Sequence, residues 1–462
     1  MARMNSLLWS SSRARVAAAN IIMQTPAAST VSSPANLAYT ARSENSRAAQ
    51  TTMKKILDGV VVLDLTRFFS GPQATLLLAG MGAEVIKIDD PKTGDPTAFA
   101  PPFDGPGGIS FERKSDQDMG LAYLKRQRGK KSMTLDLKSA RGRELFLQLA
   151  AKADVVVENF SPGVATRLAI DYTALCKVNP RIIYCAITGY GATGAQKDAK
   201  AYDLMIQAAV GIMSMTGPAD GPPVKIASPM SDALAGSFAA SGVVAALLHR
   251  ERTGEGQAID VSMADCLFAL IFDEPVDCYE RLNLAARQGN RIMRFSPFNT
   301  FEATDGWVAI GAATDAEWRA LLDAMGRGDI LTDPAMMNVG WRIVNNEKVD
   351  AVVTAWTRKL SKAEIVAALA AARVPCSPVR SIDEALQWSQ LLERGMIVPL
   401  TNPLTGAAAG ARGPGFPVKF SRTPADYDTP SPLPGAHTEE VQARFANLSA
   451  ADVRALRNDG II

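Results

Sequence analysis

Two aspartate residues of this sequence each stand at the expected start of an apolar helix. Asp203 precedes the segment Leu204–Met213, and Asp232 precedes Ala233–Leu248. The free N–H groups and the positive dipole of a helix N-terminus favour an anion there. Both residues therefore suit helix capping, the ordinary role of aspartate at such a position. The alternative is that Asp232 is a covalent nucleophile and Asp203 a supporting carboxylate in the same active site.

A second group of candidate residues lies at the end of a buried strand. Asn159 and Phe160 directly follow the apolar run ADVVVE, and Arg167 lies on the expected next helix. Ligands bind at the carboxyl ends of the strands in parallel sheets. Asparagine before Ser-Pro-Gly is equally suited to a plain turn, so this pattern alone leaves both interpretations open.

Charge and glycine content single out two more segments. Residues 125–138 are rich in lysine and arginine, which suits either a solvated surface or a cradle for phosphate groups. The loop TGYGATGAQKDAK, residues 188–200, leads into Asp203, and its glycines permit tight turns or close approach of the backbone to a ligand. The basic residues of the first segment are Lys125, Arg126, Arg128, Lys130, Lys131 and Lys138.

The elements that must position these side chains alternate as strand, helix and strand. VVVLDL, a helix over Gln73–Met81 and AEVIKID form one βαβ unit, and a second cycle runs from MTLDL to RIIYCAITGY. Buried strands that alternate with helices predict a parallel sheet. The turn Arg67–Pro72 after the first strand lacks the G-x-G-x-x-G with which dehydrogenases approach a pyrophosphate. A nicotinamide dehydrogenase is therefore a distant alternative.

The length of the chain favours two domains, because 462 residues exceed one simple core. The pattern predicts an α/β protein with a Rossmann-like parallel-sheet large domain plus a smaller α+β domain. A hairpin with Asp305-Gly306 as its turn opens the smaller one. The expected division is a leader at 1–52, the first part of the large domain at 53–270, a linker at 271–297, the small domain at 298–380, and a return linker with the completion of the large domain at 381–462.

Composition narrows the class of protein. The formal net charge is +2, so no basic field predicts nucleic-acid binding. No run of 18 apolar residues occurs, and Ala233–Leu248 is short and rich in glycine and serine, so we expect no membrane span. Five scattered cysteines lack metal-binding spacing and suit reduced thiols. With only two histidines, His249 and His437, neither a metal site nor a serine-hydrolase triad is expected, and no permanently bound cofactor is predicted.

The first 52 residues differ from the rest. They are rich in Ala, Ser and Thr and contain arginine but no lysine, and their one acidic residue is Glu44. That composition is typical of a mitochondrial transit peptide. A start at Met53, just before the folded pattern begins, is the other interpretation. The second interpretation predicts a cytoplasmic protein and the first a protein of the mitochondrial matrix.

Read in order, the motifs from about Ile56 to the C-terminus resemble the family III CoA-transferases, also called the CaiB/BaiF family. This family includes formyl-CoA transferase, carnitine CoA-transferase and succinyl-CoA-dependent dicarboxylate transferases. The motifs that carry the resemblance are LDLTRFFSGP, GAEVIKID, KKSMTLDLK, VENFSPG, NPRIIYCAITGYG, AYDLMIQAAVGIMSMTG, MSDALAG and RTGEGQAIDVSMAD.

The resemblance implies a role for each candidate residue. Asp232 is similar to the nucleophilic aspartate of the family, and Asp203 stands where relatives have a supporting acidic residue. An interlocked homodimer is also implied, with the large domain built from both ends of each chain. The residues that resemble the family's CoA contacts are Leu135, Lys138, Asn159, Phe160, Arg167 and Lys200.

The implied reaction moves CoA from an acyl-CoA donor to a small carboxylic or dicarboxylic acid. Aspartate is ionised at neutral pH, since its ordinary pKa is about 3.9, so Asp232 could attack a thioester without a general base. An aspartyl anhydride and an aspartyl-CoA thioester would follow. One alternative is the 2-methylacyl-CoA racemase branch, which has histidine where Tyr202 stands here. The other is a CoA-ester-binding protein without turnover, which would need neither carboxylate.

The resemblance also bears on the acid that accepts CoA. The formyl-CoA transferase branch has glutamine where Phe69 stands here, and a tetraglycine loop that this chain lacks. The pattern is closer to the succinyl-CoA-dependent dicarboxylate branch. We expect Arg67, Arg291 or Arg294 to pair either with the distal carboxylate of such an acid or with a surface acid of the protein itself.

Overall fold

The computed structural model describes residues 55–271 and 274–462. The expected leader at 1–52 lies outside the described residues, and with it the sequence basis for choosing between cytoplasm and mitochondrial matrix. The division of the chain at 270, 297 and 380 stays a prediction.

Six parallel strands form the main sheet, in the order β5-β2-β1-β6-β7-β8. Counted along the chain within this sheet, that order is 3-2-1-4-5-6, the arrangement of a doubly wound dinucleotide-binding sheet. The α/β fold with a parallel sheet is therefore confirmed. The strands are β1 (Val61–Asp64), β2 (Glu84–Asp89), β5 (Lys130–Thr134), β6 (Val155–Glu158), β7 (Ile183–Thr188) and β8 (Ala258–Ser262).

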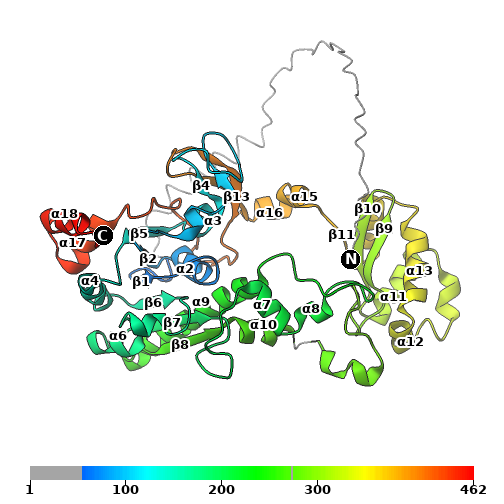
Figure 1. Ribbon diagram of the computed structural model, residues 1–462. Coiled ribbons are helices and arrows are strands. Elements are labelled where there is room, and N and C mark those ends of the chain that lie inside the picture. The colour runs from blue at the N-terminus through cyan, green and yellow to red at the C-terminus, as the bar shows by residue number, and fades with distance from the viewer. Residues whose placement is uncertain (1–54, 272–273) are drawn as a thin grey trace, which may run out of the picture. The chain divides into compact units, whose positions relative to one another are not determined.

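Helices cover both faces of this sheet, because the four central strands, β1, β2, β6 and β7, bury apolar side chains on both sides. One face packs against helices from the middle and the end of the chain, and Figure 1 shows the C-terminal pair beside α4 and β5. The chain end is tied to the sheet by hydrogen bonds from Asp136 N–H to Ile461 O (2.7 Å) and from His437 N–H to Ser132 O (2.8 Å). The helices of this face are α4 (Ala140–Ala150), α6 (Tyr172–Val178), α17 (Thr438–Ala446) and α18 (Ala450–Asn458).

The opposite face packs against α2 (Ser70–Gly80), α7 (Asp203–Ala209), α9 (Met230–Thr253) and α10 (Met263–Ile271). The expected helix Leu204–Met213 is wrong in one respect, because Gly211 with φ +91° separates α7 from α8 (Ile212–Met215). A left-handed backbone of this kind ends a helix.

Helix α9 is longer than predicted. It has 24 residues, and among the described residues it is the one helix long and apolar enough, by length and composition, to cross a bilayer. The core helix of a globular protein meets the same criteria, and positions such as Ala239, Val243 and Leu247 pack into the core between α9 and the main sheet. The expectation that the chain does not enter a membrane stays a prediction.

A second hydrophobic core surrounds the three-stranded antiparallel sheet β11-β10-β9. The predicted hairpin is confirmed, but its two-residue turn is Thr304-Asp305, one position earlier than expected, because Gly306 already pairs with Ala303. Residues 376–378 pair with β10 as a third strand. These elements are β9 (Phe298–Ala303), β10 (Gly306–Gly311), β11 (Cys376–Pro378), α11 (Asp315–Ala324), α12 (Val339–Val344), α13 (Asn346–Thr357) and α14 (Lys362–Ala371).

Short elements complete the described chain. Two antiparallel pairs, β3 with β4 and β12 with β13, lie outside both sheets. Two helices, α17 and α18, follow His437, and Asn447 with φ +55° separates them. The short elements are β3 (Phe103–Asp104), β4 (Met119–Gly120), α3 (Leu121–Arg126), α5 (Val164–Arg167), α15 (Ile382–Leu386), α16 (Ser389–Glu393), β12 (Ile397–Thr401) and β13 (Ala408–Pro414).

Candidate active site

The candidate site lies where the strand order of the main sheet reverses. β1 and β6 are neighbours, but the chain leaves them toward opposite edges of the sheet. Ligands of doubly wound sheets bind in the crevice that opens at the carboxyl ends of two such strands. The loop after β1 (residues 65–69) and the loop after β6 (residues 159–163) meet there.

Asn159 joins these two loops. Its Oδ1 accepts a hydrogen bond from Arg67 N–H (2.8 Å), and its Nδ2 donates to Arg67 O (2.8 Å). Arg126 on α3 donates from Nη1 to Phe68 O (2.6 Å). Phe68 itself has φ +65°, a left-handed conformation that costs a non-glycine residue about 1–2 kcal/mol. The loop after β1 is thus held in a strained shape by contacts from two other segments.

Buried charges lie under the same loop. Lys87 Nζ donates to Thr66 O (2.7 Å) and pairs with Asp89 (2.9 Å) and Asp95 (3.1 Å). Lys130 Nζ pairs with Asp64 (3.0 Å). The basic run 125–138 is therefore neither one solvated face nor one phosphate cradle. Lys130 is buried, Arg128 stacks on Tyr427, Lys131 pairs with Glu84 and Glu440, and Lys138 is exposed beside Asp90.

Asp232 lies in the first turn of α9 and faces the N-terminus of α2. The hydroxyl and the backbone N–H of Ser70 both hydrogen-bond its carboxylate. The two helices come this close at Gly236, where an added Cβ would lie 2.6 Å from Ser70 O. Asp232 does not cap its own helix, whose N-cap residue is Pro229 and has no side-chain capping bond. The capping interpretation therefore fails for Asp232.

Asp203 acts as a helix cap, the other role that its position in the sequence allowed. Its Oδ1 accepts from Ser231 N–H (2.8 Å) and Ser231 Oγ (2.7 Å), and its Oδ2 accepts from Gln207 Nε2 (2.7 Å). It thus fixes the start of α9 from α7, as a capping carboxylate does. It is buried, and it does not line the cavity that holds Asp232. Its charge nevertheless acts on Asp232.

The environment of Asp232 makes its carboxylate expensive to ionise. Burial and the negative charge of Asp203 raise its pKa to about 6, against the lowering effect of the Ser70 hydrogen bonds and the positive charge of Arg126. At pH 7 to 8 the group is still mostly ionised, since the pH exceeds the pKa. The result is a poorly solvated carboxylate, the form that a nucleophile requires.

Two adjoining cavities receive most of the predicted site residues. The first, the Asp232 cavity of about 400 Å³, is also lined by Lys200, Tyr202 and Met263. The second, the Lys138 cavity of about 440 Å³, contains Leu135, with Arg67 and Asp90. Both cavities share the residues Phe68, Asn159, Phe160 and Ser161.

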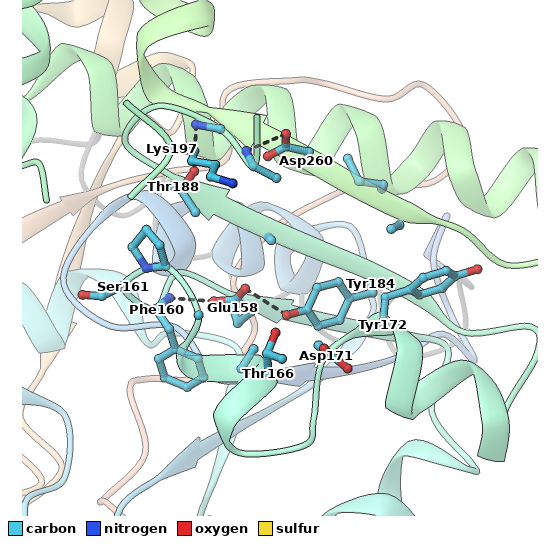
Figure 2. A pocket seen from close by; sticks show the side chains of 18 of the residues that line it. Glu158, Phe160, Ser161, Thr166, Asp171, Tyr172, Tyr184, Thr188, Lys197 and Asp260 are labelled. Atoms are coloured by element: carbon cyan, nitrogen blue, oxygen red, sulfur yellow. Dashed lines mark hydrogen bonds between the residues drawn. The ribbon is translucent and has the colours of Figure 1, made fainter. Parts of the chain in front are cut away.

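A third cavity of about 380 Å³ lies beside the loop after β6 (Figure 2). Glu158 accepts hydrogen bonds from Phe160 N–H (2.6 Å) and Tyr184 Oη (2.9 Å), which the dashed lines mark. Burial raises the pKa of Glu158 to about 7, against these two hydrogen bonds. Glu158 thereby fixes the position of the Phe160 backbone N–H.

The predicted CoA contacts are divided between two cavities, and one of them lies outside both. Asp232, Lys200, Asn159 and Phe160 meet in one cavity, while Leu135 and Lys138 share the next one with Asn159 and Phe160. Arg167 is exposed on α5 against Gly163 and lines none of these three cavities.

Sequence reasoning missed four contributors to the site. Ser70 was visible only as part of a turn, Arg126 was one of six basic residues in its segment, Phe68 had no signal, and Glu158 was hidden at the end of an apolar strand. The three arginines that were expected to pair with a substrate carboxylate or a surface acid also lie in different surroundings. Arg291 pairs with Asp350 (2.8 Å) and Arg294 with Glu274 (2.7 Å), while Arg67 lines the Lys138 cavity rather than the Asp232 cavity.

Comparison with known proteins gives a consistent picture. Residues 57–438 match the family model described as CoA-transferase family III. The chain is 34% identical over 397 residues to the succinate–glutarate CoA-transferase of Agrobacterium fabrum, covering 86% of this chain and 97% of that one. It is 37% identical over 381 residues to the acetyl-CoA:oxalate CoA-transferase of Acetobacter aceti, covering 82% and 92%.

A solved structure agrees with these relatives. A CaiB/BaiF family protein from Brucella suis superposes with a TM-score of 0.72 at 31% identity, covering 85% of this chain and all of that one. The relatives' names differ in the acid, glutarate in one and oxalate in the other, and agree in the transfer of CoA. With its parallel sheet and its matched motifs, the chain belongs to CoA-transferase family III, and it is a CoA-transferase.

Proposed function

We propose that this enzyme moves CoA from an acyl-CoA donor, succinyl-CoA or a similar thioester, to a small carboxylic or dicarboxylic acid, with Asp232 as the covalent nucleophile. The observation that carries the proposal is the position of Asp232. Its partly buried carboxylate lines a cavity that adjoins the Lys138 cavity through four shared residues. CoA is a long substrate, and two joined cavities suit its thioester end and its phosphate-bearing end.

In the proposed first half-reaction, a carboxylate oxygen of Asp232 attacks the thioester carbon. The C–S bond breaks, and an aspartyl-acyl anhydride and CoA thiolate form. The thiolate then attacks the aspartyl carbonyl carbon of the anhydride. The donor acid leaves as its carboxylate, and Asp232 carries CoA as a thioester.

The second half-reaction reverses these steps with another acid. The acceptor carboxylate attacks the aspartyl thioester and expels CoA thiolate, which then attacks the acyl carbonyl of the new anhydride. Acyl-CoA leaves and the Asp232 carboxylate is restored. Each step exchanges one anion for another, so no proton has to be moved. The intermediates hydrolyse in water, and partial burial of Asp232 limits that loss.

The CoA contacts are part of the same proposal. Lys138 is exposed at the mouth of its cavity and carries the positive charge that a phosphate requires. Lys200 lines the Asp232 cavity, and Leu135, Asn159 and Phe160 supply its walls and those of the Lys138 cavity. Arg167 is proposed as a contact outside these cavities. Asp203 would act through α9 and through its charge rather than by touching the substrate.

Assembly as an interlocked homodimer is proposed as well. Apolar side chains are exposed on the helices that cover one face of the main sheet: Leu204, Met205, Phe238, Val244, Leu248 and Leu270. A second copy of the chain would cover such surface. Sedimentation of the purified protein tests this, and a concentration-independent monomer would contradict it.

A transfer assay tests the function. Purified enzyme is mixed with succinyl-CoA and a panel of acids, and new acyl-CoA esters are separated by chromatography. We expect at least one acid to receive CoA. Asp232→Ala should lower the rate by roughly 10³-fold or more, as loss of a covalent nucleophile does. Ser237→Ala, an exposed position on the same helix, is the matched control and should keep the wild-type rate.

The racemase and the binding protein are the opposing outcomes of this assay. Tyr202 is 69% exposed, and neither His249 nor His437 lines the Asp232 cavity. Exchange of an α-proton of a 2-methylacyl-CoA in deuterated water, without transfer of CoA, would replace the proposal by racemisation. Tight binding of acyl-CoA without either reaction would indicate a non-catalytic protein.

A further inference from the structure

One backbone loop is common to all three cavities of the site. The loop after β6 contributes Phe160 and Ser161 to the Asp232 cavity, to the Lys138 cavity and to the third cavity alike. The first two of these cavities are the ones that we propose for CoA. Their shapes therefore depend on where the backbone of Phe160 is held.

That backbone is held from the third cavity by Glu158, the last residue of β6. Its Oε2 accepts a hydrogen bond from Phe160 N–H (2.6 Å), and its Oε1 accepts one from Tyr184 Oη (2.9 Å), as Figure 2 shows. Tyr184 lies on β7, the strand that pairs with β6 in the main sheet. Through these two bonds the position of Phe160 N–H is tied to a neighbouring strand of the sheet.

This arrangement is costly for the fold. Glu158 is 5% exposed, and within residues 55–271 and 274–462 no cation acts on its charge. Burying a carboxylate without a cation costs free energy, and burial raises its pKa to about 7 against both hydrogen bonds. The other residues of β6 are three buried valines, so an apolar side chain would suit the strand better. A charge kept at such a cost is typical of a residue that serves a functional site.

We propose that Glu158 is a positioning residue for CoA, which fixes Phe160 N–H against Tyr184 and thereby sets the wall that the Asp232 and Lys138 cavities share. Glu158 lines neither of these two cavities, so it acts through Phe160 rather than by touching the substrate. The inference rests on the proposed CoA transfer and deepens it, because it assigns part of the affinity for CoA to a residue outside the CoA cavities.

Three variants separate the hydrogen bonds of Glu158 from its charge and from its place in the fold. Glu158→Met removes both acceptor oxygens and keeps the length of the side chain. Glu158→Gln keeps an oxygen for Phe160 N–H, and its amide can donate to Tyr184 Oη, because a hydroxyl is both a donor and an acceptor. Thr173→Val changes another residue that lines the third cavity, at an exposed position of α6, and is the matched control.

Titration calorimetry with CoA gives Kd, and steady-state transfer from succinyl-CoA gives KM and kcat. We expect Glu158→Met to raise Kd for CoA and KM for succinyl-CoA roughly 10- to 100-fold, as the loss of hydrogen bonds to a charged acceptor does. Its kcat at saturating succinyl-CoA should stay within about threefold, because Asp232 itself is unchanged. Glu158→Gln and Thr173→Val should keep Kd and KM within about threefold of the wild-type values.

Melting temperature distinguishes positioning from a purely structural role. Glu158→Met should melt within about 4 °C of the wild-type protein, because the removed charge was itself costly to bury. A parallel loss of melting temperature and of CoA affinity would make Glu158 a residue of the fold alone and would overturn the inference.

Two further results would overturn it. An unchanged Kd in Glu158→Met would show that CoA does not depend on this support of Phe160. A loss in Glu158→Gln as large as in Glu158→Met would assign the effect to the charge rather than to the hydrogen bonds. Failure of the underlying function is distinct from these results, because the wild-type enzyme would then neither bind CoA nor transfer it.

Discussion

Two carboxylates lie at opposite ends of the loop between β1 and α2, and their surroundings differ sharply: Asp64 ends β1, and the partly buried Asp232 of α9 faces Ser70 at the start of α2. Asp64 is fully buried, and burial alone would raise its pKa. The charges of Lys130 and Lys87 and the hydroxyls of Thr66 and Thr75 outweigh burial and bring the pKa below its ordinary value. Asp64 is thus fully compensated.

Asp232 has no such compensation. Burial and the charge of Asp203 raise its pKa to about 6, and only Ser70 and the more distant Arg126 oppose them. A compensated carboxylate stabilises the fold, whereas an under-compensated one costs stability and is left able to react. The comparison teaches that the degree of pairing, rather than burial, separates the structural from the chemical carboxylate.

The largest expected effect on stability is at Asp64. Asp64→Asn leaves Lys130 buried without its partner, so the free energy of unfolding should fall by about 3–5 kcal/mol. Denaturant titration measures this. Glu144→Gln, which breaks the exposed Arg141–Glu144 pair, is the control and should cost under about 1 kcal/mol. If Asp64→Asn lost no more stability than Glu144→Gln, the distinction between a compensated and an under-compensated carboxylate would be contradicted.

A smaller effect, on the pH dependence of activity, is expected when Asp203 is replaced. Asp203→Asn removes a negative charge that opposes ionisation of Asp232, so the pKa of Asp232 should fall, by about one unit. Because the ionised form reacts, the acidic limb of kcat/KM against pH should move down from a midpoint near 6. Asp220→Asn, the same change at an exposed loop position, should not move it. A profile unchanged in Asp203→Asn would mean that the two carboxylates do not interact.

The smallest expected effect is a gain in stability. The pKa of Asp232 in the folded state, about 6, exceeds the ordinary value of 3.8. Its contribution is therefore fully present below about pH 4 and is lost as the pH rises through 6. Asp232→Asn lacks this loss and should raise the free energy of unfolding by about 1–2 kcal/mol at pH 8, but hardly at about pH 3.5, below the ordinary pKa. Destabilisation at pH 8 would contradict the account of Asp232 as under-compensated.

Much of the fold could be predicted from the sequence, because buried strands and helix periods are local patterns. The loops after β1 and β6 were placed at strand ends, and Asp203 and Asp232 at helix starts, for this reason. Strand order, which creates the crevice between β1 and β6, depends on long-range pairing and was beyond local patterns. The break at Gly211 needed knowledge of a backbone angle.

The residues of the site divide in the same way, into those that local patterns identify and those that depend on long-range packing. Asp232, Asn159 and Lys200 could be named from motifs. Ser70 and Arg126, and Glu158 in its hydrogen bond with Tyr184, acquire their contacts only when distant segments pack together. Lys130 and Arg126 lie in one basic run, yet one is buried against Asp64 and the other stacks on Phe69. Charge content alone does not separate two such fates.

The most direct test of the account is to trap CoA on Asp232. The enzyme is mixed with succinyl-CoA without an acceptor acid, digested rapidly at low pH, and its peptides are measured by mass spectrometry, with hydroxylamine treatment as a second reading. We predict a CoA adduct that maps to Asp232, is converted to a hydroxamate by hydroxylamine, and is absent from Asp232→Ala. Transfer of CoA that proceeds with no adduct, or with an adduct on another residue, would contradict the central claim that Asp232 is the nucleophile.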